Sequence, residues 1–199
     1  FISATVPIQN GCDLGLGMAV TKEGELRVTR IDPLGLFHDS PICVGDKILS
    51  INHMDCTDDC EQGLVDDLLA MVKEVTIVVE AARNADSSVV AAMVTKPSPN
   101  SMVGIVLRQR RRDGFRRTVV SKIFEDGLLM NSLLNVGDRL LSINGHDCST
   151  AVTVHEAVDF IKRAKGVVTI VTQPQHDVGA VISATGRLRD VMSILHSVL

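Results

Sequence analysis

The sequence predicts a mostly β chain with some α structure, folded as two small, partly open barrels or sandwiches that each contain one long and one short helix. The main observation is a repeat: Val44–Asn52 returns as Val136–Asn144, with seven of nine residues identical at an offset of 92 positions. Short β-rich runs surround each copy, and one run with helical spacing follows it. A repeat of about 90 residues is the size of a small independent domain.

The repeat divides the 199-residue chain into two domains, a short linker and an extension. Similarity continues outside the nine residues, because Val75–Val78 returns as Val168–Val171. The linker is too short to allow much relative motion of the domains. The predicted boundaries are 1–82 for the first domain, 83–88 for the linker, 89–174 for the second domain and 175–199 for the extension.

Strands are expected in the same order in both copies, with tight turns at the Asn52-His53 and Asn144-Gly145 dipeptides. In the first copy they are expected at Phe1–Ile8, Met18–Thr21, Leu26–Ile31, Lys47–Ile51 and Val75–Glu80. In the second copy they are expected at Val89–Thr95, Ile105–Arg108, Thr118–Ile123, Arg139–Ile143 and Val168–Thr172. A short helical turn follows the third strand of each copy, and a long helix precedes the last, at Glu61–Lys73 and Val154–Lys165.

These segments resemble PDZ domains. Gly15-Leu16-Gly17-Met18 looks like the carboxylate-binding loop of that family, and Met102-Val103-Gly104-Ile105 is a looser version. The repeated Val-Gly-Asp-(Lys/Arg)-(Ile/Leu)-Leu-Ser-Ile-Asn segment is similar to the strand after the short helix of the family. Loop, strands and helices occur in the family's order over residues 1–174. The chain therefore resembles a tandem PDZ protein with two PDZ domains in a syntenin-like arrangement.

The resemblance implies a scaffold that binds the C-termini of other proteins and carries no cofactor. In such a domain a glycine loop offers consecutive backbone N–H groups to the terminal carboxylate, and the peptide adds as a strand to an open sheet edge. The resemblance assigns the peptide-binding loop and strand to Leu16, Gly17, Met18 and Val20 in the first copy and to Val103, Gly104, Ile105 and Leu107 in the second.

Two helical registers compete for the other groove wall of the second copy. A register that begins at His155 predicts a ligand Ser or Thr two residues before its end, but it turns Asp159 and Lys162 into a pocket that should be apolar. A register that begins at Val154 gives two apolar faces, and we favour it. It places Val154, Val158 and Ile161 on the groove and Ala157, Phe160 and Ala164 toward the core. It predicts an apolar ligand residue at that position, with His155 flanking the groove.

In the first copy the alignment places Glu61, Val65 and Leu68 on the groove. A shift of one residue stays open, because Asp67 then falls where a core residue is expected. Glu61 leaves the peptide class of this copy undefined.

The net charge of −4 conceals two opposite halves. Residues 1–82 carry 5 Lys/Arg against 14 Asp/Glu, whereas residues 88–174 carry 12 against 7. The basic excess lies in a predicted hairpin that turns at Asp113-Gly114. Its arginines should attract phosphates, anionic lipid or acidic partners. Alternatively, the hairpin is only a solvated loop, or it contacts the acidic first domain. These arginines are Arg108, Arg110, Arg111, Arg112, Arg116 and Arg117.

Composition excludes several classes of function. The chain has no Trp or Tyr, which argues against the stacking platforms of single-stranded nucleic-acid binders. No nucleophile elbow, zinc-protease motif, P-loop or dinucleotide fingerprint occurs, so we expect no enzyme. The chain could still be the regulatory PDZ region of a larger protease, or a membrane-surface adaptor.

The five cysteines, an odd number, indicate a reducing compartment, hence a cytoplasmic protein, peripheral to membranes if the arginine hairpin binds lipid. Cys56 and Cys60 lie four residues apart near His53, but four metal ligands do not assemble locally, so no metal is expected.

The end of the chain has two incompatible interpretations. Ser197-Val198-Leu199 resembles a common PDZ ligand and would allow self-association. Apolar residues at near-helical spacing over Arg187–Leu199 instead predict an amphipathic helix.

Overall fold

The structure is a computed structural model that describes all residues except 9–13, 58–72, 83–88, 113–114, 151 and 176–199. The described residues form β-strands and one α-helix. The strands of the N-terminal half are β1 (Ile2–Pro7), β2 (Leu16–Val20), β3 (Leu26–Ile31), β4 (Lys47–Ile51), β5 (Met54–Asp55) and β6 (Glu74–Glu80). The C-terminal half contains β7 (Val90–Thr95), β8 (Ile105–Arg112), β9 (Phe115–Ile123), β10 (Arg139–Ile143), β11 (His146–Asp147), α2 (Val154–Arg163) and β12 (Val167–Gln173).

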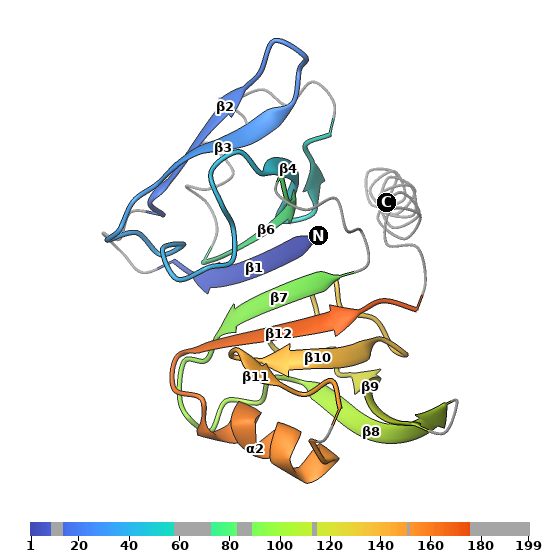
Figure 1. Cartoon of the computed structure of the whole chain (residues 1–199). Helices are drawn as coiled ribbons and strands as arrows, with labels where there is room; N and C mark the ends of the chain where they lie inside the picture. The colour runs from blue at the N-terminus through green and yellow to red at the C-terminus, as the bar shows by residue number, and fades with distance from the viewer. Residues whose placement is uncertain (9–13, 58–72, 83–88, 113–114, 151, 176–199) are drawn as a thin grey trace, which may run out of the picture.

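All strands belong to one continuous mixed sheet in the order β2-β3-β4-β6-β1-β7-β12-β10-β9-β8, with β5 and β11 paired at its side. The halves meet where β1 runs parallel to β7, with Ile2 opposite Ala91 and Thr5 opposite Val94. In Figure 1, β1 and β7 lie together at the centre, and β2 and β8 lie far apart. The prediction of a mostly β chain with some α structure is confirmed. The sequence predicted two separate barrels or sandwiches, however, whereas the two halves share one sheet.

Two hydrophobic cores lie in the two halves, and β7 contributes to both. Alternate side chains of a strand point to opposite faces of the sheet. Ala92 and Val94 accordingly pack into the C-terminal core, whereas Met93 packs into the N-terminal core with 1% exposure. A partly buried hydrogen bond also crosses between the halves, because the Leu133 backbone N–H donates to the Ser3 hydroxyl at 3.2 Å. The halves are therefore packed together as well as paired.

Equivalent residues of the two sequence copies form equivalent hydrogen bonds. The Asn52 side chain accepts from the Thr76 backbone N–H at 2.7 Å, and the Asn144 side chain accepts from the Thr169 N–H at 2.6 Å. Both asparagines have a positive φ of 47°, which Asn tolerates better than most residues. The shared turn geometry explains why an Asn follows β4 in the first copy and β10 in the second.

The two aspartates of the repeat also have matching roles. Asp46 accepts from the Cys43 N–H at 2.8 Å, and Asp138 accepts from the Asn135 N–H at 2.9 Å. Both carboxylates are 1% exposed, and buried carboxylates need such donors. Each one fixes the loop that enters the repeated strand.

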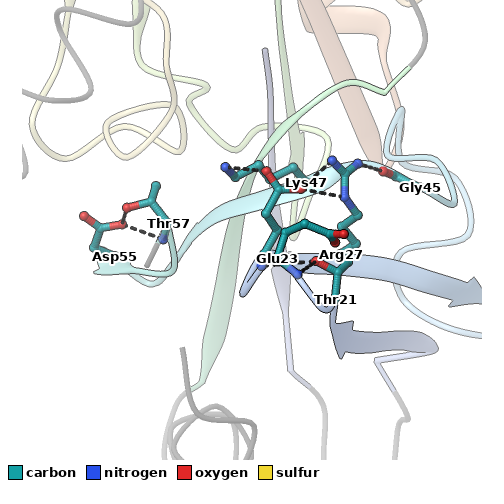
Figure 2. A network of polar contacts seen from close by, with 8 residues as sticks. Thr21, Glu23, Arg27, Gly45, Lys47, Asp55 and Thr57 are labelled. Carbon is teal, nitrogen blue, oxygen red and sulfur yellow. Dashed lines mark hydrogen bonds and ion pairs between the residues drawn. The ribbon is translucent and has the colours of Figure 1, made fainter. Parts of the chain in front are cut away.

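A charged cluster lies along β3 and β4 in the first half (Figure 2). Glu25 accepts from Arg27 at 2.6 Å and from Lys47 at 3.0 Å. These two hydrogen bonds, the one from Arg27 first, lower the pKa of Glu25. Arg27 also donates to the Gly45 carbonyl at 2.7 Å.

Three predicted features differ in the structure. The short helices are successive turns after β3 and β9, closed by bonds such as His38 N–H to Gly35 O and Met130 N–H to Gly127 O. The arginine hairpin is confirmed but longer than expected, because its strands pair up to Arg112 and Phe115. The helix predicted at Val154–Lys165 ends at Arg163. The predicted first-copy helix lies, apart from Lys73, outside the described residues, as do the linker and the residues from 176 onward.

Candidate functional site

A groove of about 420 Å³ lies in the C-terminal half where α2 packs against β8. Apolar side chains and two lysines line it, and three of the loop and strand residues predicted for peptide binding contribute to it. The lining residues are Lys96, Pro99, Asn100, Ser101, Met102, Val103, Gly104, Ile105, Phe124, Val158, Ile161 and Lys162. Leu107, the fourth predicted residue, is buried in the core beneath.

The loop at one end of the groove has free backbone donors. The Val103 carbonyl accepts from the Leu129 N–H at 3.1 Å, and the Gly104 carbonyl accepts from the Phe124 N–H at 2.8 Å. Within the described residues, the N–H groups of Val103 and Gly104 themselves donate no hydrogen bond. Two successive unpaired amides form an anion-binding nest. A carboxylate at this end of the groove would satisfy both.

The wall opposite β8 is formed by α2, which begins with a capping box. The Glu156 N–H donates to the Thr153 hydroxyl at 3.3 Å, and the Thr153 N–H donates to the Glu156 carboxylate at 2.8 Å. Hydrogen bonds from the Thr153 backbone and then its side chain lower the pKa of Glu156. The cap satisfies N–H groups that would otherwise lack partners, and it fixes where the groove wall starts.

The structure brings Val158 and Ile161 to the groove, but not Val154, which packs at the edge of the core. His155 points to solvent with an 88% exposed side chain, and its Nε2 lies 3.9 Å from Asp159. On the other face, Ala157 is fully buried and Phe160 stacks on His146 at 4.5 Å. Lys162, assigned to the disfavoured register, also lines the groove.

Sequence reasoning missed Lys96. This lysine is 5% exposed, and its Nζ donates to the carbonyls of Pro99 at 2.7 Å, Ala164 at 3.2 Å and Ile161 at 3.3 Å. It thereby satisfies carbonyls at the end of α2, where a positive charge is favourable. Its helix partners lie 65 to 68 residues away in sequence, so no local pattern could identify them.

In the first half, the backbone bonds that match those of Val103 and Gly104 lie two residues before the predicted Leu16 and Gly17. Leu14 and Gly15 carry the equivalent bonds, because Leu14 O accepts from Phe37 N–H and Gly15 O accepts from Asp32 N–H. Gly15, with φ +67°, is therefore the structural equivalent of Gly104. The predicted residues all lie in β2, which pairs with β3: they are Leu16, Gly17, Met18 and Val20. The other three, Glu61, Val65 and Leu68, lie outside the described residues.

The arginine hairpin continues the groove strand. Arg110 pairs with Arg117 and Arg111 with Arg116 across the two strands. Four of these side chains, Arg108, Arg110, Arg111 and Arg116, are exposed, and Arg117 is half-buried. Among the described residues, no acidic side chain forms an ion pair with any of the five. The sixth, Arg112, belongs to β8, but its side chain is not described.

The exposed Cys43 and the buried Cys148 have free thiols, and Cys56 and Cys148 lie in the two cores. Burial raises the pKa of the Cys148 thiol. In the described part of the chain, no three His, Cys, Asp or Glu residues gather as a metal site, while Cys60 lies outside it. No described helix is long and apolar enough to cross a membrane.

Comparisons with known proteins found PDZ domains. No curated protein matches the chain. Among solved structures it is similar to the second PDZ domain of Dlg1 from the choanoflagellate Monosiga brevicollis, with 22% identity, a TM-score of 0.37, and coverage of 43% of this chain and 99% of that one. It is also similar to the third PDZ domain of INAD, solved in complex with a TRP channel tail, with 23% identity, a TM-score of 0.38, and coverage of 45% and 89%. The PDZ domain family model matches residues 92–173. Residues 92–173 of this chain are thus a PDZ domain, a module that generally binds C-terminal peptides.

Proposed function

We propose that this protein is a scaffold whose groove between β8 and α2 binds the C-termini of partner proteins by strand addition. One observation supports the proposal most directly: β8 is the terminal strand of the sheet, and the free N–H groups of Val103 and Gly104 lie where β8 begins. An added strand would pair with β8 while its carboxylate occupies the amides.

The ligand would end in an apolar residue and carry a second apolar residue two positions earlier. Both would point into the groove, whose lining includes Ile105, Val158 and Ile161. We expect micromolar affinity, about −8 kcal/mol, which is typical of a single module. Peptides with free and with amidated C-termini test the proposal. Equal affinity for the two would contradict the role of the amides.

We further propose that residues 1–82 form a second PDZ-like domain, joined by residues 83–88 to a domain at 89–174. The matched bonds of Asn52 and Asn144 and of Asp46 and Asp138 support this division. The strand β2 also ends the sheet, opposite to β8. Its carboxylate loop would be Leu14-Gly15-Leu16. A Gly104 variant that loses binding in the second groove leaves the first groove to be measured alone in the full chain.

An anionic membrane is a second candidate partner, suggested by the unpaired arginines of the hairpin. Each arginine near a charged surface contributes roughly 1 kcal/mol. Binding of the chain to phosphatidylserine vesicles, measured at two salt concentrations, tests this candidate. Vesicle binding that persists after Arg110→Gln and Arg111→Gln would exclude the hairpin as the lipid site.

The remaining proposals concern context. A non-catalytic, cytoplasmic protein fits the free thiols of Cys43 and Cys148. Protease activity of a longer gene product would instead favour a regulatory PDZ region. Self-association through Ser197-Val198-Leu199 is a further proposal. Deletion of the last two residues should then raise the affinity for added peptide or abolish concentration-dependent association.

A further inference from the structure

We propose that the groove of the PDZ domain selects C-terminal tails that carry a run of acidic residues from the third to the seventh position before the terminal residue. This inference rests on the proposed binding of C-termini at β8. It assigns the arginine hairpin, which lies outside the groove, to the ligand segment that leaves the groove.

The register follows from the geometry of β8. A peptide whose carboxylate occupies the Val103 and Gly104 amides has its last residue beside Ile105. An antiparallel partner then advances one residue for each residue of β8, with a rise of about 3.4 Å per step. The one irregularity of the hairpin does not disturb this count: Val106 pairs with Lys122 and Leu107 with Val120, so the extra residue belongs to β9. The third ligand residue before the last therefore lies beside Arg108, and the seventh beside Arg112.

Arginines meet this part of the ligand on both faces of the sheet. Directly opposite residues in an antiparallel pair share a face, and neighbours along a strand alternate. Arg110 and Arg117 therefore lie on one face, and Arg111 and Arg116 lie on the other. Since both faces carry positive charge, successive ligand residues all benefit from a negative side chain. The hairpin favours a continuous acidic run instead of one acidic residue at a fixed position.

These arginines do not stabilise the hairpin itself. Like charges directly opposite each other destabilise a strand pair, and two such pairs, Arg110 with Arg117 and Arg111 with Arg116, occur in succession. No acidic side chain of the described residues neutralises them. An acidic strand beside β8 would offset this repulsion, because its carboxylates would lie next to the guanidinium groups of β8 on both faces of the sheet.

A peptide explains the arrangement better than a membrane does. A membrane surface is flat and contacts one face of a two-stranded hairpin, whereas the pairs Arg110–Arg117 and Arg111–Arg116 occupy opposite faces. A strand added to the edge of β8 has side chains on both faces and can reach both pairs. Arg108, Arg110 and Arg111 also lie on the terminal strand of the sheet, next to the open edge.

The test uses the full chain and labelled peptides that end in Val-Ser-Val with a free carboxylate. The five residues upstream of this end are all Glu, all Ser or all Lys. At low salt the Glu peptide should bind about tenfold more tightly than the Ser peptide, and the Lys peptide more weakly than both. In about 1 M salt, where the screening length is about 3 Å, the difference should nearly vanish.

A matched pair of variants locates the effect. Arg110→Gln with Arg111→Gln should remove most of the preference for the Glu peptide and leave the Ser peptide unchanged. Lys22→Gln with Arg30→Gln makes the same change in net charge on exposed residues of the first half, and it should leave the preference intact. Equal loss in both variants would mean that only net charge matters and would overturn the inference.

Two further outcomes separate this inference from the proposed function. If the Glu and Ser peptides bind equally while amidation weakens both, the acidic selectivity is wrong and the binding of C-termini stands. If amidation changes no affinity, the proposed function itself is wrong. If Arg110→Gln with Arg111→Gln abolishes binding to phosphatidylserine vesicles but leaves the Glu preference unchanged, the hairpin is a membrane site and the inference is overturned.

Discussion

Gly104 packs against Gly127 so closely that a Cβ atom on either residue would overlap the Cα atom of the other. Gly15 and Gly35 form the same contact in the first half. In the second half this contact presses the loop with the free amides against the turn after β9. Glycine is needed there for two reasons, since Gly104 also has a φ of +86°.

The first prediction is that Gly104→Ala destabilises the chain and abolishes peptide binding at the second groove. The positive φ costs an L-residue about 1–2 kcal/mol, and the overlap with Gly127 adds about 1–3 kcal/mol of overpacking. Denaturant unfolding measures the sum, and peptide titration measures the loss of the nest.

Gly145→Ala is the control for this prediction. Gly145 has a φ of +78°, but no atom lies within 4 Å of where its Cβ would be. Its substitution should cost only about 1–2 kcal/mol and leave peptide binding unchanged. Similar losses for the two variants would mean that the contact with Gly127 is not the constraint.

The loop of the first half illustrates where sequence reasoning stopped. Leu14-Gly15-Leu16-Gly17-Met18 contains two overlapping apolar-Gly-apolar triplets, and nothing local distinguishes them. The distinction comes from Gly35, which contacts Gly15 and lies 20 positions later in the chain. Sequence could identify the kind of loop, but its position depended on a tertiary contact.

Local patterns predicted the rest of the second half well. The hairpin around Asp113-Gly114, the helix start at Val154 and the repeat ending in Asn144 all follow from turn residues, caps and periodicity. The parallel pairing of β1 with β7 does not. Both strands are buried on two faces, although Ser3 and Thr5 make one face of β1 polar. The sequence pattern does not specify which strand pairs with which.

The second prediction concerns this junction. Met93→Ala should destabilise the N-terminal half although residue 93 belongs to β7, because its side chain is buried in the N-terminal core. The expected cost is about 2–5 kcal/mol. Met130→Ala, at a residue 50% exposed, should change stability by less than about 0.5 kcal/mol. Met93→Ala with unchanged stability would contradict the shared packing.

The third prediction is a pH dependence of α2. Hydrogen bonds from Thr153 lower the pKa of Glu156 from its ordinary value of 4.5. A carboxylate with a lowered folded-state pKa stabilises the fold above its unfolded pKa, and this contribution is lost as the pH falls through the folded value. Peptide affinity should therefore weaken below about pH 4.5 as the helix start frays.

Glu156→Gln tests the assignment, because the amide oxygen can still accept from the Thr153 N–H but does not titrate. This variant should lose the part of the acid dependence that Glu156 causes. Thr153→Ala should cost about 1 kcal/mol at neutral pH. An acid dependence identical in the parent and in Glu156→Gln would assign it to another group.

The last prediction decides between the two registers of α2. Val158 lines the groove, whereas His155 is 88% exposed at its side chain and does not. A peptide with Val two residues before its end should therefore bind more tightly than one with Thr there. Val158→Ala removes two methyl carbons from this contact and should weaken the Val peptide by about 1–1.5 kcal/mol, roughly tenfold in affinity. His155→Ala should alter neither peptide. If instead the Thr peptide binds better and His155→Ala abolishes its advantage, the imidazole swings into the groove on binding, and the register that begins at His155 is the functional one.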